Sequence, residues 1–78
     1  MDKYLSRVKA IIVEKTGVDP DEIDDNSYFE EDLNIGELEL ADIYGAIEEE
    51  YHVEFAEEEK EEIESIMELV ESLIEKAE

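Results

Sequence analysis

The chain has no cysteine, one proline and one histidine among its 78 residues. Without cysteine it can form no disulfide, thiolate metal site or cysteine nucleophile. The one histidine, His52, has no second imidazole to share a metal ion, so we expect it to be an exposed turn residue and expect no metal site. Cations are scarce too, with 6 Lys and Arg against 27 Asp and Glu and a net charge of −21.

This charge balance excludes some classes of partner and favours others. Nucleic acid is excluded, because binding to it is driven by cationic side chains that release counterions from phosphates. Anionic membrane surfaces are disfavoured for the same reason. The negative field instead favours fast, salt-sensitive encounter with basic patches on other proteins, and weak, diffuse binding of divalent cations.

No apolar run is long enough for a signal peptide or a membrane span, so we expect a cytoplasmic protein that does not insert into membranes. A chain of 78 residues closes only one core, which predicts a single domain over residues 1–78. Its 42 % of apolar residues is too high for a disordered acidic tail. We expect no enzyme, because abundant carboxylates without a companion nucleophile do not define a catalytic site.

Apolar residues recur at helical spacing in three long segments, and no segment requires a strand. The spacing predicts long helices over about 2–16, over about 37–51 and from 66 onward, with a short polar helix over about 57–62. Asp19 can cap one short turn, Gly17 can end the first helix, and Ser65 with Glu68 forms a capping box for the last. The predicted fold is therefore an all-α bundle of three long helices and one short helix, with a long loop after the first.

Large apolar residues indicate which faces should be buried. The loop before the second long helix should be pinned to the core by three of them, Tyr28, Phe29 and Leu33. The apolar face of the second long helix should consist of Leu38, Ile43, Ile47 and Tyr51.

The segment Asp32–Tyr51 resembles the acyl carrier motif, which typically reads D-L-G-x-D-S-L-D-x-V-E-L followed by an acidic stretch that ends in an aromatic residue. The register needs no gap. Similar placement holds for Ser27–Leu33 ahead of it and for Glu54–Glu59 behind it, so the likeness covers essentially the whole chain. The resemblance implies membership of the acyl carrier protein family and an acyl-carrier-like four-helix bundle.

The chain departs from this motif at its functional centre, where Gly36 and Glu37 replace the Asp-Ser pair. In the family, the serine hydroxyl carries 4'-phosphopantetheine, and Glu37 has no hydroxyl. A carboxylate attacking the same donor would give a mixed anhydride that hydrolyses readily. None of the remaining serines has the D-S-L context; they are Ser6, Ser27, Ser65 and Ser72. We therefore predict that the chain carries no phosphopantetheine.

The resemblance also implies a docking surface on the second long helix, facing basic patches of acyl-carrier-dependent enzymes. The predicted partner-binding residues are Glu37, Leu38, Glu39, Asp42, Tyr44 and Glu48. Tyr44 lies off the predicted core stripe, and we expect it to be an exposed aromatic anchor. A negative charge at Glu37 would stand where a phosphate sits in the family. We expect a monomer.

Other interpretations stay open. Glu37 is also a good residue for the first turn of any helix, and the acids beside it are also typical of a solvated face. A second hypothesis is a working acyl carrier in fatty acid, lipid or polyketide biosynthesis. A weaker one is an acidic protein that buffers cations, although only Asp19, Asp21 and Glu30 fit the spacing of an EF-hand loop.

Overall fold

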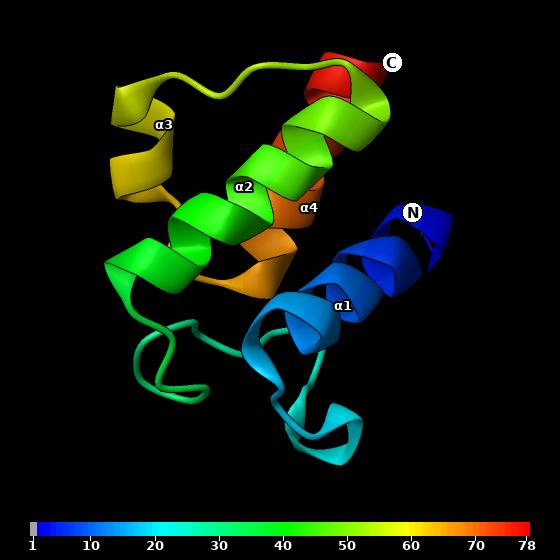
Figure 1. Ribbon diagram of the computed structural model, residues 1–78. Helices are drawn as coiled ribbons and strands as arrows, with labels where there is room; N and C mark the ends of the chain where they lie inside the picture. Colours follow the sequence, from blue (N-terminus) through cyan, green and yellow to red (C-terminus); the bar gives the residue numbers. More distant parts are fainter. Residues whose placement is uncertain (1) are drawn as a thin grey trace.

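The computed structural model describes residues 2–78 and is helical, as the spacing of apolar residues predicts (Figure 1). Within those residues no strand is present, and one isolated antiparallel bridge joins Tyr28 to Ser65. Three helices are long and one is short: α1 Asp2–Thr16, α2 Glu37–Tyr51, α3 Glu57–Glu62 and α4 Ile66–Ala77. A single 3-10 turn, η1 Pro20–Glu22, follows α1. The predicted all-α bundle with a long first connection is confirmed.

Helix α1 packs against both α2 and α4, and the short α3 stands to one side of α2 (Figure 1). The segment after α2 runs back along the bundle to reach α3, so α3 lies beside the body of α2 and not beyond its end. The core between these elements is almost entirely aliphatic. Its most completely buried side chains are Phe29, Ile12, Ile43, Ile47, Ile66, Leu69, Leu73, Val8 and Val70.

Local sequence signals set the ends of the helices. Gly17 adopts a left-handed φ of 76° directly after α1, which suits a residue without a Cβ. The Asp19 side chain accepts a hydrogen bond from the amide of Asp21 and caps η1. Ser65 accepts from the Glu68 amide while the Glu68 carboxylate accepts from the Ser65 amide, which confirms the capping box of α4.

The long loop before α2 is fixed by backbone hydrogen bonds as well as by burial. The Phe29 amide donates to the Glu64 carbonyl, and the Ile66 amide donates to the Ser27 carbonyl. Phe29 and Leu33 are buried as predicted, whereas the prediction for Tyr28 is wrong because its side chain is 44 % exposed. Neighbouring side chains in extended backbone point to opposite sides, so the bridge at Tyr28 turns Phe29 inward and Tyr28 outward.

The prediction that Leu38 belongs to the buried face of α2 is also wrong, since Leu38 is 86 % exposed. The buried face of α2 contains Ile43 and Ile47, and the partly buried Leu40 packs against the core at the edge of that face. At 3.6 residues per turn, Leu38 lies about 140° around the helix from Ile43. The side chain is therefore directed to solvent at the start of the helix.

Candidate functional site

Helix α2 begins at Gly36 and Glu37, the two positions that depart from the acyl carrier motif. Gly36 is the N-cap, with extended backbone angles of φ −90° and ψ 179°, and Glu37 is the first helical residue. The Glu39 carboxylate accepts a hydrogen bond of 3.2 Å from the Gly36 amide. Glu37 is exposed and adds a second negative charge to the first turn, where the helix dipole favours it.

The predicted partner-binding residues divide into three groups. Glu37, Leu38 and Asp42 are exposed, and Leu38 and Asp42 share one face because they are four residues apart. Helix α2 contains no Lys or Arg, so its exposed side has one sign of charge. These three side chains are free to meet another molecule.

Glu39 and Glu48 are only partly exposed, and both are used by the chain's own backbone. Glu39 closes the cap at Gly36, as described above. The Glu48 carboxylate accepts a 2.8 Å hydrogen bond from the amide of Phe55, which is buried. Sequence reasoning had no signal for this second bond, because Phe55 lies in the irregular segment after α2. This hydrogen bond therefore fixes the segment between α2 and α3 against α2.

The prediction that Tyr44 is an exposed anchor is wrong, because only 3 % of its surface is exposed. The segment after α2 and helix α3 cover this side of α2. Phe55 packs edge-on against the Tyr44 ring at a centroid distance of 5.1 Å, and the Lys60 ammonium lies 5.5 Å from the ring centroid. Burial, reinforced by the charge of Glu59, raises the pKa of the Tyr44 hydroxyl. Among the described residues this hydroxyl has no hydrogen-bond partner.

Lysine and aromatic side chains form a stack that ties α3 to the bundle. Lys60 lies over Tyr44, Tyr44 contacts Phe55, and Lys76 of α4 lies 5.4 Å from the Phe55 centroid. Lys76 also forms a 2.8 Å ion pair with Glu59, and this contact lowers the pKa of Glu59. Lys60 and Lys76 are the two cations of the sequence outside α1, so both are held by the stack.

Two adjoining clefts flank the start of α2, with volumes of about 540 and 310 Å³. Both are bounded by α2 on one side and by α3 on the other. They share four lining residues, Glu37, Leu40, Lys60 and Glu61, and so form one continuous groove. We refer to these two clefts together as the α2–α3 groove.

His52 is exposed, as predicted, and ends α2 in a left-handed conformation with φ 57°. Within residues 2–78, no three His, Cys, Asp or Glu side chains are grouped closely enough to hold a metal ion. None of the helices in that range is long and apolar enough to cross a membrane.

The helical architecture agrees with the small carrier-type domain that the motif in residues 32–51 predicts. The family described as "Phosphopantetheine attachment site" matches residues 6–73 of the chain. The chain therefore belongs to this family, whose acyl carrier proteins are carriers and not enzymes.

Acyl carrier proteins of several bacteria are similar to the chain over most of its length. That of Helicobacter hepaticus is 39 % identical over 90 % of this chain and 91 % of its own. That of Chlamydia caviae is 38 % identical, covering 81 % and 82 %. That of Thermosynechococcus vestitus is 34 % identical, covering 87 % and 84 %. The predicted family is confirmed.

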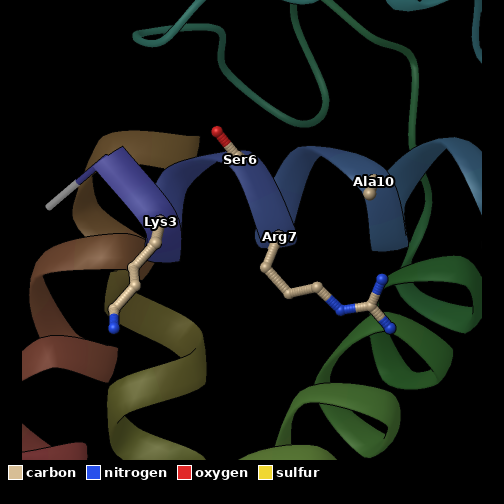
Figure 2. A pocket seen from close by; sticks show the side chains of 4 residues that line it. All are labelled: Lys3, Ser6, Arg7 and Ala10. Atoms are coloured by element: carbon tan, nitrogen blue, oxygen red, sulfur yellow. The ribbon is translucent and has the colours of Figure 1, made fainter.

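The residues at the start of α2 do not fit the prosthetic group that the family name implies. Attachment through a phosphate ester needs a free hydroxyl, and Glu37 offers a carboxylate. The Ser27 and Ser65 hydroxyls are buried and engaged in local hydrogen bonds. Ser6 is exposed in the second turn of α1, where Figure 2 shows it directed away from Arg7. Arg7 itself reaches Glu50 of α2 in a two-pronged ion pair with a shortest contact of 2.6 Å.

Proposed function

We propose that this chain is a member of the acyl carrier family that lacks the 4'-phosphopantetheine arm and acts by binding proteins. The observation that carries the proposal is the carboxylate of Glu37, exposed at the first position of α2 where the motif has serine. The chain would keep the carrier fold and its acidic surface without the means to hold cargo. We propose that it does so as a monomer in the cytoplasm.

The proposed docking surface is the exposed start of α2, centred on Glu37, Leu38 and Asp42. Its partners would be acyl-carrier-dependent enzymes that present Lys and Arg around an apolar contact. Charge complementarity of this kind accelerates encounter and selects partners, while a central apolar contact supplies affinity. Glu39, Glu48 and Tyr44 would support this surface from behind, through the contacts described above.

A working acyl carrier is the second candidate, and the three relatives named as acyl carrier proteins favour it. It requires an attachment point other than residue 37. Intact mass spectrometry distinguishes the two candidates directly.

After incubation with coenzyme A and a broad-specificity phosphopantetheinyl transferase, the unchanged chain is expected to keep its mass. The Glu37→Ser variant is expected to gain one phosphopantetheine, because serine restores the hydroxyl at the helix start. A Glu37→Ala variant controls for the loss of the carboxylate alone and should gain nothing. A mass gain by the unchanged chain would contradict the proposal, and peptide mapping would then identify the modified residue.

Docking is tested by Glu37→Gln, which removes one charge and keeps the shape of the side chain. We expect its affinity for a carrier-dependent enzyme to fall about threefold to tenfold, with a smaller loss at high salt. Glu71→Gln is the matched control, because Glu71 is an exposed acid of α4. Equal affinities for both variants and the unchanged chain, measured by titration calorimetry, would remove Glu37 from the docking surface.

A further inference from the structure

We propose that α3 is a strap over Tyr44 that stays closed through the positive charge of Lys76, and that N-acylation of Lys76 opens it. The strap is α3 itself, residues 57–62, which lies to one side of α2 (Figure 1). This device belongs to the chain alone and does not depend on the proposed docking function.

Helix α3 contributes no buried side chain to the core. It consists of five glutamates and one lysine, and none of them is buried. Within residues 2–78 the helices that pack closely are α1 with α2 and α1 with α4, and α3 belongs to neither pair. So short a helix is not stable by itself in water, because helices in proteins form mainly through the packing of an apolar face. Contacts other than apolar burial must therefore keep α3 in place.

The two ends of α3 are fixed to the bundle by the residues that flank it. Phe55, just before α3, is buried, and its amide donates a hydrogen bond to the Glu48 carboxylate. Just after α3, the Glu64 carbonyl accepts a hydrogen bond from the Phe29 amide. These flanking residues can therefore act as hinges while the helix between them moves.

Charged side chains make the contacts in the middle of α3. The Lys76 ammonium of α4 lies 2.8 Å from the Glu59 carboxylate, and the Lys60 ammonium lies 5.5 Å from the centroid of the Tyr44 ring. The Ser72 hydroxyl adds a long hydrogen bond of 3.5 Å to Glu59. Ion pairs and cation–ring contacts between partly exposed side chains are individually weak. The closed position of α3 therefore depends on a few weak contacts.

Two features oppose closure. The first is repulsion between like charges, because α3 and α4 line a cleft of about 270 Å³ with acids on both sides. These acids are Glu59, Glu62, Glu68, Glu71 and Glu75. The second is the Tyr44 hydroxyl, which belongs to a side chain that is 3 % exposed and has no hydrogen-bond partner among the described residues. A buried polar group without a partner costs free energy, and water recovers that cost when the group becomes exposed.

Lys76 is the charge that decides between the closed and open positions. Its ammonium contacts Glu59 and also lies 5.4 Å from the centroid of the Phe55 ring, and its side chain is 24 % exposed. Lys60 is the other cation in residues 57–78, and it moves with α3. Without the charge of Lys76, Glu59 would stand unpaired opposite the acids of α4.

N-acylation removes this charge. The neutral amine of Lys76 attacks the carbonyl carbon of an acyl thioester, an amide C–N bond forms as the C–S bond breaks, and the thiol leaves. Of the two protons that the ammonium loses, one goes to solvent and the other to the leaving sulfur. The product amide is uncharged and bulkier than the ammonium, so it forms neither the ion pair with Glu59 nor the cation contact with Phe55.

The test places acetyl-lysine at residue 76 or at residue 15 of the full chain by genetic code expansion. Lys15 is exposed on α1 and makes no described ion pair, so its acetylation is the same charge change at a control position. The amides of Lys60 and Ile63 donate to the carbonyls of Ala56 and Glu59 and report on α3. Their hydrogen exchange should become about tenfold faster on acetylation at Lys76 and less than about twofold faster on acetylation at Lys15.

Nitration by tetranitromethane, mapped by peptide mass spectrometry, gives a second measure of opening. In the unmodified chain Tyr28, which is 44 % exposed, should react readily, and Tyr44, which is 3 % exposed, should be protected. Acetylation at Lys76 should raise the nitration rate of Tyr44 about tenfold and leave that of Tyr28 unchanged.

Variants separate the effect of the charge from that of the hydroxyl. Lys76→Gln should reproduce the acetylated chain, and Lys76→Arg, which keeps the charge, should resemble the unmodified chain. Tyr44→Phe removes the unpartnered hydroxyl and should slow exchange in α3 about threefold. Urea denaturation followed by circular dichroism shows whether the fold as a whole is retained.

Access to the lysine is measured by incubating the full chain with acetyl-coenzyme A and mapping the acetylated residues. Because Lys76 is partly covered and ion-paired, we expect it to react more slowly than Lys15, and faster in Glu59→Gln than in the unmodified chain. Lys76 left unmodified in both after Lys15 has reacted completely would overturn the proposal.

Three further results would overturn it: equal effects of acetylation at Lys76 and Lys15, equal behaviour of Lys76→Gln and Lys76→Arg, and α3 amides of the unmodified chain that exchange as fast as in an unfolded peptide. A rise in Tyr44 nitration that follows global unfolding would do so as well, because the opening would then not be local.

Discussion

Phe29→Ala is expected to lower the free energy of unfolding by about 3 to 5 kcal/mol, the cost of removing a fully buried aromatic ring and leaving a cavity. Phe29 is 1 % exposed, and its backbone is hydrogen-bonded to both Glu64 and Ile35. The ring therefore holds the loop before α2 against the bundle and positions the start of α2. Urea denaturation followed by circular dichroism measures the change.

Tyr28→Ala provides the matched control for this prediction. Tyr28 is the adjacent aromatic residue and is 44 % exposed, so its removal should change the free energy of unfolding by less than about 1 kcal/mol. Similar losses in both variants would contradict the assignment of Phe29, and not Tyr28, to the core. Because a loss of this size can unfold a domain of 78 residues, Phe29→Leu serves as the milder variant.

Glu48→Ala is expected to lower the free energy of unfolding by about 1 to 2 kcal/mol, because it leaves the Phe55 amide, whose hydrogen bond is partly buried, without its acceptor. The same change should loosen α3, since Phe55 connects α2 to the lysine and aromatic stack. Hydrogen exchange at the Phe55 amide, which should become faster, reports the local effect directly.

Glu49→Ala is the control for charge, since Glu49 is the exposed neighbour on α2 and makes no described hydrogen bond to the backbone. It should be neutral or slightly stabilising, because it removes one negative charge from a strongly acidic surface. Glu48→Gln keeps an acceptor and should recover much of the lost stability. If Glu48→Ala and Glu49→Ala behave alike, Glu48 is only one member of a solvated face.

The sequence predicted the helices well because their signals are local. The bounds of α1, α2 and α3 agree with the predicted ranges, and Asp19, Ser65 and Gly17 act at the predicted helix ends. Caps and turns are decided by side chains within a few residues of the backbone groups that they satisfy. Such interactions can be recognised without knowing how the chain folds.

The candidate site was predicted less completely, because its exposure depends on distant parts of the chain. Tyr44 is buried by Phe55 and Lys60, which return to α2 only after an irregular segment with no periodic pattern. Leu38 is apolar and lies on α2, but the helical rotation places it on a different face from Ile43 and Ile47, so its apolar character alone does not predict burial. Glu39 and Glu48 look like free acids in the sequence, and only the fold shows which amides they bind.

The backbone at Gly36 is extended, and a Cβ added there would meet no atom within 4 Å. Position 37 is exposed as well, so the pair that distinguishes the chain from its motif lies outside the packed interior. Aspartate and serine could therefore be introduced at these two positions without rearranging the helices. If the proposed function holds, the chain and its doubly substituted form would then be two proteins of one shape, able to compete for the same enzyme while only the substituted form delivers cargo.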